Sequence, residues 1–203
     1  IYAVASFAMR IGAIKLFDAG DVQANGFQVI EDDQPGDAFT ESGASYMGFS
    51  VSALLAGTLA DKGRYIVAFT GDGSFIMSPQ ILVDAVVHGA KGMIVVFDNR
   101  RMGAISSLQA AQYGPDFGTS DHVEIDFVAL ANAVKGVKGF FGGWSIGELE
   151  SALNQAYAHD GLSVVHVPVY WGRLEEGGMG AYGRWNVGPW VDEVEKRYRE
   201  QPI

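Results

Sequence analysis

Two apolar segments of the chain each end in a short polar motif, and this arrangement restricts the folds that the chain can adopt. The first segment, Arg64 to Phe69, runs into Gly71-Asp72-Gly73-Ser74-Phe75, and the second, Met93 to Phe97, runs into Asp98-Asn99. Apolar runs of this length predict buried strands, and Pro79 to His88 between them predicts a helix. We therefore expect two adjacent parallel strands whose polar ends lie at the same edge of a sheet.

That edge is where an open α/β sheet binds its ligand, because loops leaving the carboxyl ends of the strands form a crevice where the strand order reverses. Asp72 offers a carboxylate oxygen there, and Asn99 offers an amide oxygen. Together with a loop carbonyl and phosphate oxygens, they suit a hard octahedral cation such as Mg2+, which usually shares its coordination shell with a phosphorylated ligand. The sequence therefore predicts a joint site for a metal ion and a phosphorylated ligand.

The glycines of the first motif have a separate role. Gly71 and Gly73 allow a tight turn and close approach of the backbone, while the N–H groups of Ser74 and Phe75, at the start of a helix, can face a diphosphate. Taken alone, Gly-Asp-Gly is usually a turn whose Asp caps the next helix, and a single Asn is most often a loop residue. Both motifs together, at this spacing and on these elements, favour the ligand site.

At these residues the chain resembles the thiamine diphosphate (ThDP) enzymes related to acetolactate synthase, whose cofactor motif is Gly-Asp-Gly followed some two dozen residues later by Asn. The resemblance implies that Asp72 and the side chain of Asn99 bind Mg2+, and that the main-chain carbonyl of Arg101 completes the protein ligands. Asp98 stands where many relatives have a first Asn. We expect this difference to change the charge beside the metal without touching a proposed ligand.

The segment Ser45-Tyr46-Met47-Gly48-Phe49, which opens an apolar helix, extends the resemblance. A bulky apolar side chain at Met47 would hold the thiazolium and aminopyrimidine rings of the cofactor in a bent conformation. The carbonyl of Ser45 would accept a hydrogen bond from the pyrimidine amino group. A methionine considered alone more often fills space in a hydrophobic core than supports a cofactor, and this applies to Met47 as well.

Two further contacts follow from the resemblance. Phe17 to Gln23 resembles the strand-to-loop turn that reaches the diphosphate, with Asp21 as a cofactor contact. Asp21 and Val22 nevertheless replace the polar or His residues that are common in this turn. Met102 is expected near the thiazolium, and we assign it no chemical role.

The region after Asn99 favours one branch of the family. The chain resembles the branch that hydrolyses trihydroxycyclohexane-dione in inositol breakdown, with cyclic 1,2-diketone hydrolases nearby. The residues that carry this resemblance are Phe97 to Asn99, Gly103, Ile105 to Gln109 and Trp185 to Gly188. This resemblance implies ThDP-dependent C–C bond cleavage that opens a ring. Two alternatives stay open: an acetolactate synthase-like carboligase or 2-oxo acid decarboxylase domain with the same site, and a noncatalytic binding module that retains the fold.

The resemblance also implies a part that these 203 residues do not contain. In the family a Glu on a separate pyrimidine-binding domain promotes deprotonation of the thiazolium, so no catalytic residue is assigned in this chain. We expect the chain to be inactive alone, either as a fragment, which its start at Ile1 favours, or as a subunit that needs a partner. The full enzyme is expected to be a homo-oligomer, dimer or tetramer, acting on a small carbonyl substrate. FAD could belong to the full enzyme, but no flavin site is visible here.

Composition agrees with one α/β domain and excludes several partners. A chain of 203 residues with 48% apolar and 19% charged residues can bury one sizeable core. Its net charge of −10 argues against nucleic acid and anionic membranes as partners. No apolar run has the length of a bilayer, and the absence of cysteine excludes disulfides and is compatible with a cytoplasmic location.

Apolar strands alternate with helical patterns along the chain, and Ser145 followed by Glu148 is typical of a helix start. The strands are expected near Ile14–Phe17, Tyr65–Phe69, Met93–Phe97, Val137–Phe141 and Val164–Val169. The helices are expected at Tyr2–Gly12, Met47–Ala60, Gln80–His88, Phe127–Val134 and Ile146–His159. This order predicts an α/β, three-layer, doubly wound fold with a mostly parallel sheet over residues 1–203, which is the ThDP-binding fold that the resemblance implies.

Two stretches lie outside this alternation. Gln23 to Gly43 is polar and predicts a solvent-exposed loop, while residues 170–203 form a tail rich in aromatic residues and glycine, with a short charged helix at Val191 to Arg199. We interpret the aromatic part of the tail as a packing or interface segment. The histidines show no metal-ligand spacing and are expected to be satisfied surface or core residues: His88, His122, His159 and His166.

Overall fold

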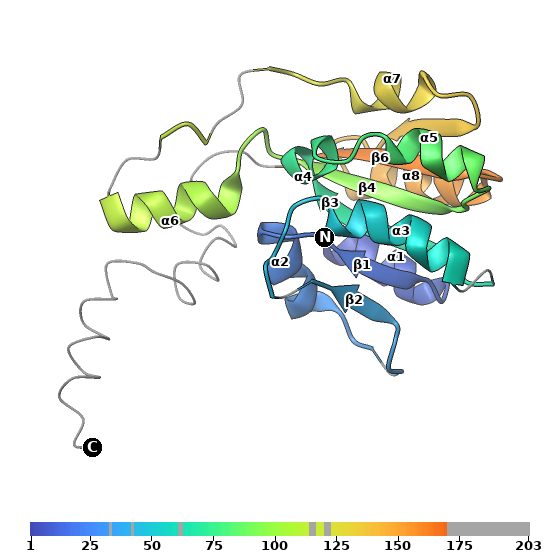
Figure 1. Cartoon of the computed structure of the whole chain (residues 1–203), viewed down its shortest axis with the longest axis horizontal. Helices are drawn as coiled ribbons and strands as arrows, with labels where there is room; N and C mark the ends of the chain where they lie inside the picture. The colour runs from blue at the N-terminus through green and yellow to red at the C-terminus, as the bar shows by residue number, and fades with distance from the viewer. Residues whose placement is uncertain (33, 42, 61–62, 114–116, 120–122, 170–203) are drawn as a thin grey trace.

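The computed structural model describes residues 1–169 apart from 33, 42, 61–62, 114–116 and 120–122, and it contains one six-stranded sheet (Figure 1). All neighbouring strands pair in parallel, in the order β2-β1-β3-β4-β6-β5. The strands are β1 (Ile14–Phe17), β2 (Ala38–Thr40), β3 (Ile66–Gly71), β4 (Gly92–Asp98), β5 (Val137–Phe141) and β6 (Leu162–Pro168). The predicted parallel α/β sheet is confirmed.

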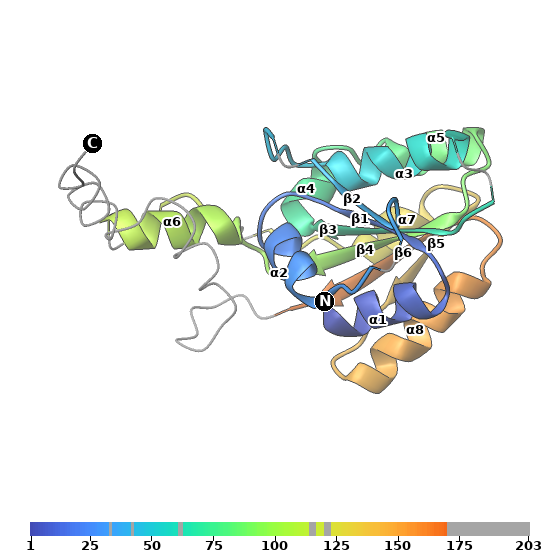
Figure 2. The same ribbon diagram turned by 90° about the horizontal axis from the view of Figure 1, so that it is seen from below.

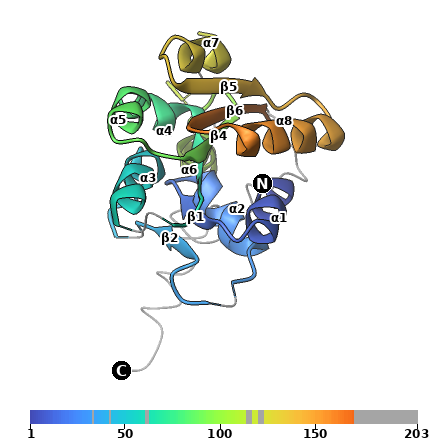
Figure 3. The same cartoon turned by 90° about the vertical axis from the view of Figure 1, so that its right-hand side faces the viewer.

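Helices cover both faces of the sheet, which gives the three layers seen when the molecule is viewed from the side (Figure 3). The helices are α1 (Tyr2–Arg10), α2 (Asp21–Val29), α3 (Phe49–Ala60), α4 (Asp72–Ile76), α5 (Ile81–Val87), α6 (Gly103–Tyr113), α7 (Phe127–Asn132) and α8 (Ile146–Ala158). One face packs against α1, α2 and α8, and the other against α3, α4, α5 and α7. The predicted doubly wound arrangement is therefore also confirmed.

The central strands are apolar on both sides because both sides are covered. In β3, Val67 and Phe69 belong to the cluster beneath α1 and α8, whereas Ile66 and Ala68 belong to the cluster beneath α3 and α5. All four side chains are fully buried. Such double burial explains why the sequence shows continuous apolar runs rather than the alternation of a half-exposed strand.

Two parts of the chain differ from the sequence prediction. The expected loop from Gln23 to Gly43 contains most of α2 and all of β2, which pairs with β1 through Leu16 and Phe39. The edge strand β2 has three residues, too few to show the apolar and polar alternation of a strand. Helix α2 buries only Val22, Ala24 and Gly26, so its apolar face is weak in the sequence. The sequence prediction also omitted helix α6. This helix projects beyond the carboxyl ends of the strands (Figures 1 and 2), and its sequence lacks the apolar stripe by which a packed helix is recognised.

Other predicted features agree, or lie beyond what is described. Helix α8 begins where expected, because the Ser145 hydroxyl accepts from the Glu148 N–H and the Glu148 carboxylate accepts from the Trp144 N–H at 2.9 Å. The predicted tail at 170–203, including its charged helix, lies outside the described residues. None of the helices in the described part of the chain combines the length and apolar character needed to span a bilayer.

A buried carboxylate at the end of β1 connects the elements around the centre of the sheet. Asp18 is fully buried, and its Oδ1 accepts from the N–H groups of Ala19 and Gly48, each at 2.9 Å. Its Oδ2 accepts from the hydroxyls of Ser50 and Thr70, also at 2.9 Å. Since a buried charge is tolerated only when it is fully hydrogen-bonded, these four donors account for its position. Asp18 thereby joins β1, β3 and the start of α3.

Replacing Asp18 by Ala should lower the free energy of unfolding by about 3 to 5 kcal/mol, because four buried donors lose their acceptor. Urea denaturation followed by circular dichroism would measure this loss. Asp160→Ala is the control, since Asp160 is exposed and pairs only with Lys91 at the surface, where ion pairs contribute little. Equal stability of the two variants would contradict the role given to Asp18.

Candidate functional site

The carboxyl ends of β1 and β3 flank the point where the strand order reverses, because the chain passes from β1 to β2 on one side and then to β3 on the other. In the pairing of β3 with β4, Gly71 lies opposite Phe97, so Asp72 and Asp98 follow at the same level. The two carboxylates are close enough for the charge of Asp98 to raise the pKa of Asp72. The two polar strand ends thus lie side by side, as the sequence predicts.

The Asp72 and Asp98 carboxylates differ in their electrostatics. Burial raises the pKa of Asp72 to about 6; the Gly73 N–H opposes this rise and the charge of Asp98 adds to it. Burial acts upward on the pKa of Asp98 too, but hydrogen bonds from His166 and from the Arg100 N–H hold this pKa below its ordinary value. The charge of Asp98 thus acts on Asp72, one of the proposed metal ligands.

The turn after β4 is held by hydrogen bonds from its own backbone. Asp98 Oδ1 accepts from the Arg100 N–H, and Asn99 Oδ1 accepts from the Arg101 N–H, each at 3.0 Å. Arg100 has a left-handed backbone with φ of 49°, which a non-glycine residue adopts only when its surroundings hold it. The main-chain carbonyl of Asp98 also accepts from Val169 at 2.9 Å. Asn99 and Arg101 therefore stand in a fixed turn at the sheet edge.

The glycine motif joins β3 to α4 and leaves open space in front of it. A Cβ placed on Gly71 would meet no atom within 4 Å, whereas one on Gly73 would lie 3.2 Å from Met47 Cε. The thioether of Met47 is therefore a direct neighbour of the motif. The side chains of Ser74 and Phe75 are buried in the first turn of α4. The N–H of Ser74 has no acceptor within the helix, whereas the N–H of Phe75 is the first that faces a helix carbonyl, that of Gly71.

Ser45 lies in an exposed loop that leads into α3. Its backbone is left-handed, with φ of 52°. The carboxylate of Glu41 holds this loop by accepting from the N–H groups of Ala44 at 2.9 Å and Gly43 at 2.6 Å, and these hydrogen bonds keep the pKa of Glu41 below its ordinary value. Met102, which precedes α6, has a half-exposed side chain and donates its N–H to the Thr119 carbonyl.

Asp21 lies where the starts of α2 and α6 approach each other. A Cβ on Gly103 would collide with Asp21 Oδ2 and would lie 3.0 Å from Asn99 Nδ2, so any other residue here would displace these side chains. The Oδ1 atom of Asp21 is buried and has no hydrogen-bond partner among the described residues. Burial raises the pKa of this carboxyl to about 6. An orphaned buried oxygen of this kind marks a place for a cation or a hydrogen-bond donor.

The donor set at this edge fits a hard cation shared with a ligand. Asp72, Asp98 and Asp21 concentrate negative charge at one side of the sheet, next to the amide of Asn99. Among the described residues, no group of three or more His, Asp or Glu side chains could hold a metal by itself. A cation such as Mg2+ would therefore need main-chain and ligand oxygens as well, which is its usual way of binding.

Two features near this edge are not predicted from the sequence: the buried carboxylate of Asp18 and the contact of His166 with Asp98. His166 was expected to be a satisfied histidine, and it is, since its Nε2 lies 2.9 Å from Asp98 Oδ2. The signal in the sequence is a histidine flanked by valines in the buried strand β6. Nothing in the sequence indicates its partner, because Asp98 and His166 are far apart in the chain.

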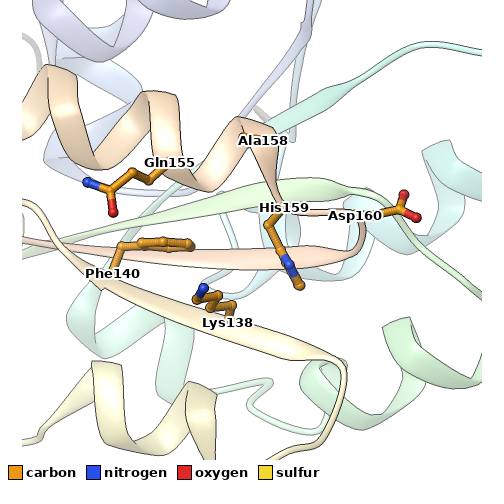
Figure 4. A pocket seen from close by; sticks show the side chains of 6 residues that line it. All are labelled: Lys138, Phe140, Gln155, Ala158, His159 and Asp160. Carbon is orange, nitrogen blue, oxygen red and sulfur yellow. The ribbon is translucent and has the colours of Figure 1, made fainter.

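A hollow of about 350 Å³ lies at the opposite, amino edge of the sheet, between β5 and the end of α8 (Figure 4). Its lining residues are Lys138, Phe140, Gln155, Ala158, His159 and Asp160. Lys138 covers the ring of Phe140 with its Nζ 5.5 Å from the ring centroid, and Asp160 pairs with Lys91. This hollow is separated from Asp72 by the length of the strands and contributes nothing to the site.

Comparison with known proteins gives matches over most of the described chain. The family model "Thiamine pyrophosphate enzyme, C-terminal TPP binding domain" matches residues 18–167. Proteins named 3D-(3,5/4)-trihydroxycyclohexane-1,2-dione hydrolase are 31% identical over 163 residues in Halalkalibacterium halodurans and 38% identical over 118 residues in Lacticaseibacillus casei. These alignments cover 77% and 55% of this chain but 25% and 18% of the relatives, so the chain spans about a quarter or less of their length.

A solved structure of benzoylformate decarboxylase from Polynucleobacter necessarius is also similar, with a TM-score of 0.70. The similarity covers 80% of this chain and 31% of that one, at 22% sequence identity. At this identity the match establishes a common fold and carries no argument about the reaction.

Asp21→Asn should stabilise the ligand-free chain near neutral pH. Because the pKa of Asp21 is raised on folding, the folded chain binds the proton more tightly than the unfolded chain, and stability falls as pH rises from about 4 to about 6. The difference from the ordinary pKa corresponds to roughly 3 kcal/mol, reduced by about 0.5 kcal/mol for a carboxylate in the first turn of α2.

We therefore expect Asp21→Asn to gain about 2 kcal/mol at pH 7.5 and almost nothing at pH 4. Urea denaturation of both proteins at the two pH values, in the presence of a chelator, measures this difference. A gain of equal size at both pH values would show that burial of the charge is not its cause.

Proposed function

Because the chain belongs to the thiamine pyrophosphate enzymes as a C-terminal TPP binding domain, we propose that it binds ThDP together with Mg2+ at the sheet edge formed by Asp72 and the turn after β4. The observation that carries the proposal is the position of Asp72 beside Asp98 at the reversal of strand order, with Asn99 in the adjacent fixed turn. Family membership supplies the cofactor, and the donor set supports the metal.

Asp72 and Asn99 are the side chains that hold Mg2+ in this proposal, with the main-chain carbonyl of Arg101. Their oxygens match the preference of this ion, and the open space in front of Gly71 leaves room for phosphate oxygens. A bound cation also relieves the repulsion between the Asp72 and Asp98 carboxylates, so both stay ionised at neutral pH. The ion thereby links the anionic protein edge to an anionic diphosphate.

The backbone around the glycine motif binds the diphosphate. Gly71 and Gly73 allow the ligand to approach the chain closely, and the N–H groups of Ser74 and Phe75 point from the first turn of α4. Burial of the Ser74 and Phe75 side chains fixes that turn, so the N–H groups do not reorganise when the ligand arrives.

Met47 supports the ring end of the cofactor in this proposal. Its thioether already lies against Gly73, which places an apolar side chain directly beside the diphosphate motif. The carbonyl of Ser45, in the loop held by Glu41, accepts from the pyrimidine amino group. Asp21 and Met102, at the starts of α2 and α6, complete the cofactor contacts.

Bound ThDP supplies the electron sink for breaking a C–C bond beside a carbonyl group. We propose that the enzyme containing this chain opens a cyclic 1,2-diketone ring by hydrolysis, which the names of the hydrolase relatives support. A carboligase or 2-oxo acid decarboxylase would use the same cofactor motif and fold, but the names of the sequence relatives do not favour it. The rest of the enzyme would provide a pyrimidine-binding domain with an activating Glu, from the same chain or from a second subunit.

Calorimetric titration tests the cofactor site directly. The chain should bind ThDP only when Mg2+ is present, and Asp72→Ala or Asn99→Ala should each weaken this binding at least about tenfold, because each removes a ligand of the cation. Asp160→Ala, at the amino edge of the sheet, should bind like the original chain. Binding that persists with a chelator, or that survives both substitutions, would refute the site.

Turnover tests the division of labour between this chain and the rest of the enzyme. With saturating ThDP and Mg2+, the chain alone should not consume cyclohexane-1,2-dione above the rate of the buffer, since the activating Glu is expected on the pyrimidine-binding domain. Ultraviolet absorbance of the diketone follows this reaction. ThDP-dependent consumption by the chain alone would disprove the proposed division.

A further inference from the structure

His166 lies in β6 and reaches diagonally across the sheet to the end of β4. In the register of these strands His166 lies opposite Val96, and its Nε2 is 2.9 Å from Oδ2 of Asp98, two residues further along. An ionised carboxylate only accepts hydrogen bonds, so Nε2 carries the hydrogen. This bond joins the interior of the sheet to the turn that follows β4.

The imidazole ring of His166 is held in place by two aromatic rings. Phe127 and Phe141 contact it edge to face, with ring centroids at 5.2 Å and 5.8 Å. The side chain of His166 is only 15% exposed. A ring packed in this way has little rotational freedom, so it presents Nε2 to Asp98 in one orientation.

Asp98 connects this fixed ring to the site. One carboxylate oxygen accepts from His166, the other accepts from the Arg100 N–H at 3.0 Å, and the main-chain carbonyl accepts from Val169. The Arg100 N–H belongs to the left-handed residue of the turn, a strained conformation that its surroundings must hold. Without His166, the Asp98 carboxylate could rotate away from Arg100.

We propose that His166 is a positioning residue for the ThDP and Mg2+ site: through Asp98 it fixes the turn that carries Asn99 and Arg101, and so strengthens Mg2+-dependent binding of ThDP. The inference rests on the function proposed above. His166 touches neither cation nor cofactor in this arrangement. It acts as the partner that orients a group next to a metal ligand, a role whose loss typically weakens metal binding 10-fold to 100-fold.

The charge of Asp98 gives this inference a specific consequence. A carboxylate beside Asp72 repels it, and the hydrogen bond from His166 fixes the orientation of the Asp98 carboxylate and so the position of its charge. A neutral Asn at position 98 could still accept from the Arg100 N–H, and it would bring no charge to direct. The contribution of His166 should therefore depend on an acid at position 98.

A double-mutant cycle tests this dependence, with calorimetric titration of ThDP at fixed and varied Mg2+. His166→Phe removes the hydrogen bond and keeps an aromatic ring between Phe127 and Phe141, and it should weaken ThDP binding at least about tenfold. His166→Gln, which can still donate, should recover part of this loss. In a chain that carries Asp98→Asn, adding His166→Phe should change the affinity by less than about twofold.

His159→Gln is the matched control, because His159 lies at the amino edge with its Nε2 3.3 Å from the Gly136 carbonyl. It should bind ThDP like the original chain. Circular dichroism and thermal unfolding without ligand establish that each variant is folded. If His166→Phe does not fold, the double-mutant cycle is measured with His166→Asn, whose side chain is too short to reach Asp98.

Each result has one meaning. Unchanged affinity of the folded His166 variant overturns the inference and leaves the proposed function intact. An equal loss with Asp and with Asn at position 98 also overturns it, because His166 would then act through packing alone. If the original chain does not bind ThDP with Mg2+, the proposed function fails and this inference fails with it.

Discussion

The arrangement of the site depends on the buried carboxylate of Asp18. It is the acceptor for donors from the loop before α3, from α3 itself and from β3, and these elements have no other common partner of this kind in the described residues. Gly48 is fixed by this carboxylate, and the loop ahead of it carries Ser45 and Met47. A charge that contacts no proposed ligand thus determines where two of the proposed cofactor contacts lie.

A second constraint is the excess of negative charge around the reversal of strand order. Asp72 and Asp21 are both buried enough for their pKa values to rise to about 6, and Asp98 is kept ionised by its hydrogen bonds. Without a cation this edge is electrostatically unfavourable to the fold. This loss of stability is typical of a functional site, since residues that destabilise the fold concentrate at such sites.

The buried central strands could be predicted from the sequence, because burial on both faces produces apolar runs. The short edge strand, the projecting helix and the side-chain contacts between distant residues could not be predicted. The apolar runs at β3 and β4 identify buried parallel strands, and their polar ends place Asp72 and Asn99 at one edge. The edge strand β2 and the projecting helix α6 bury too few apolar side chains to produce a recognisable spacing of apolar residues in the sequence. The contacts of Asp98 with His166, and of Asp21 with Gly103, join residues far apart in the chain and leave no local pattern.

The hydrogen bond between Asp18 and Thr70 has a consequence for the order in which the molecule forms. These residues are 52 positions apart, so the bond closes only after a long segment of chain has been brought back to the sheet. The strands β1 and β3 are paired across the same separation, so this bond and the sheet contacts beside it depend on the same long-range closure. Binding of a ligand at the candidate site thus reports that the centre of the sheet is complete.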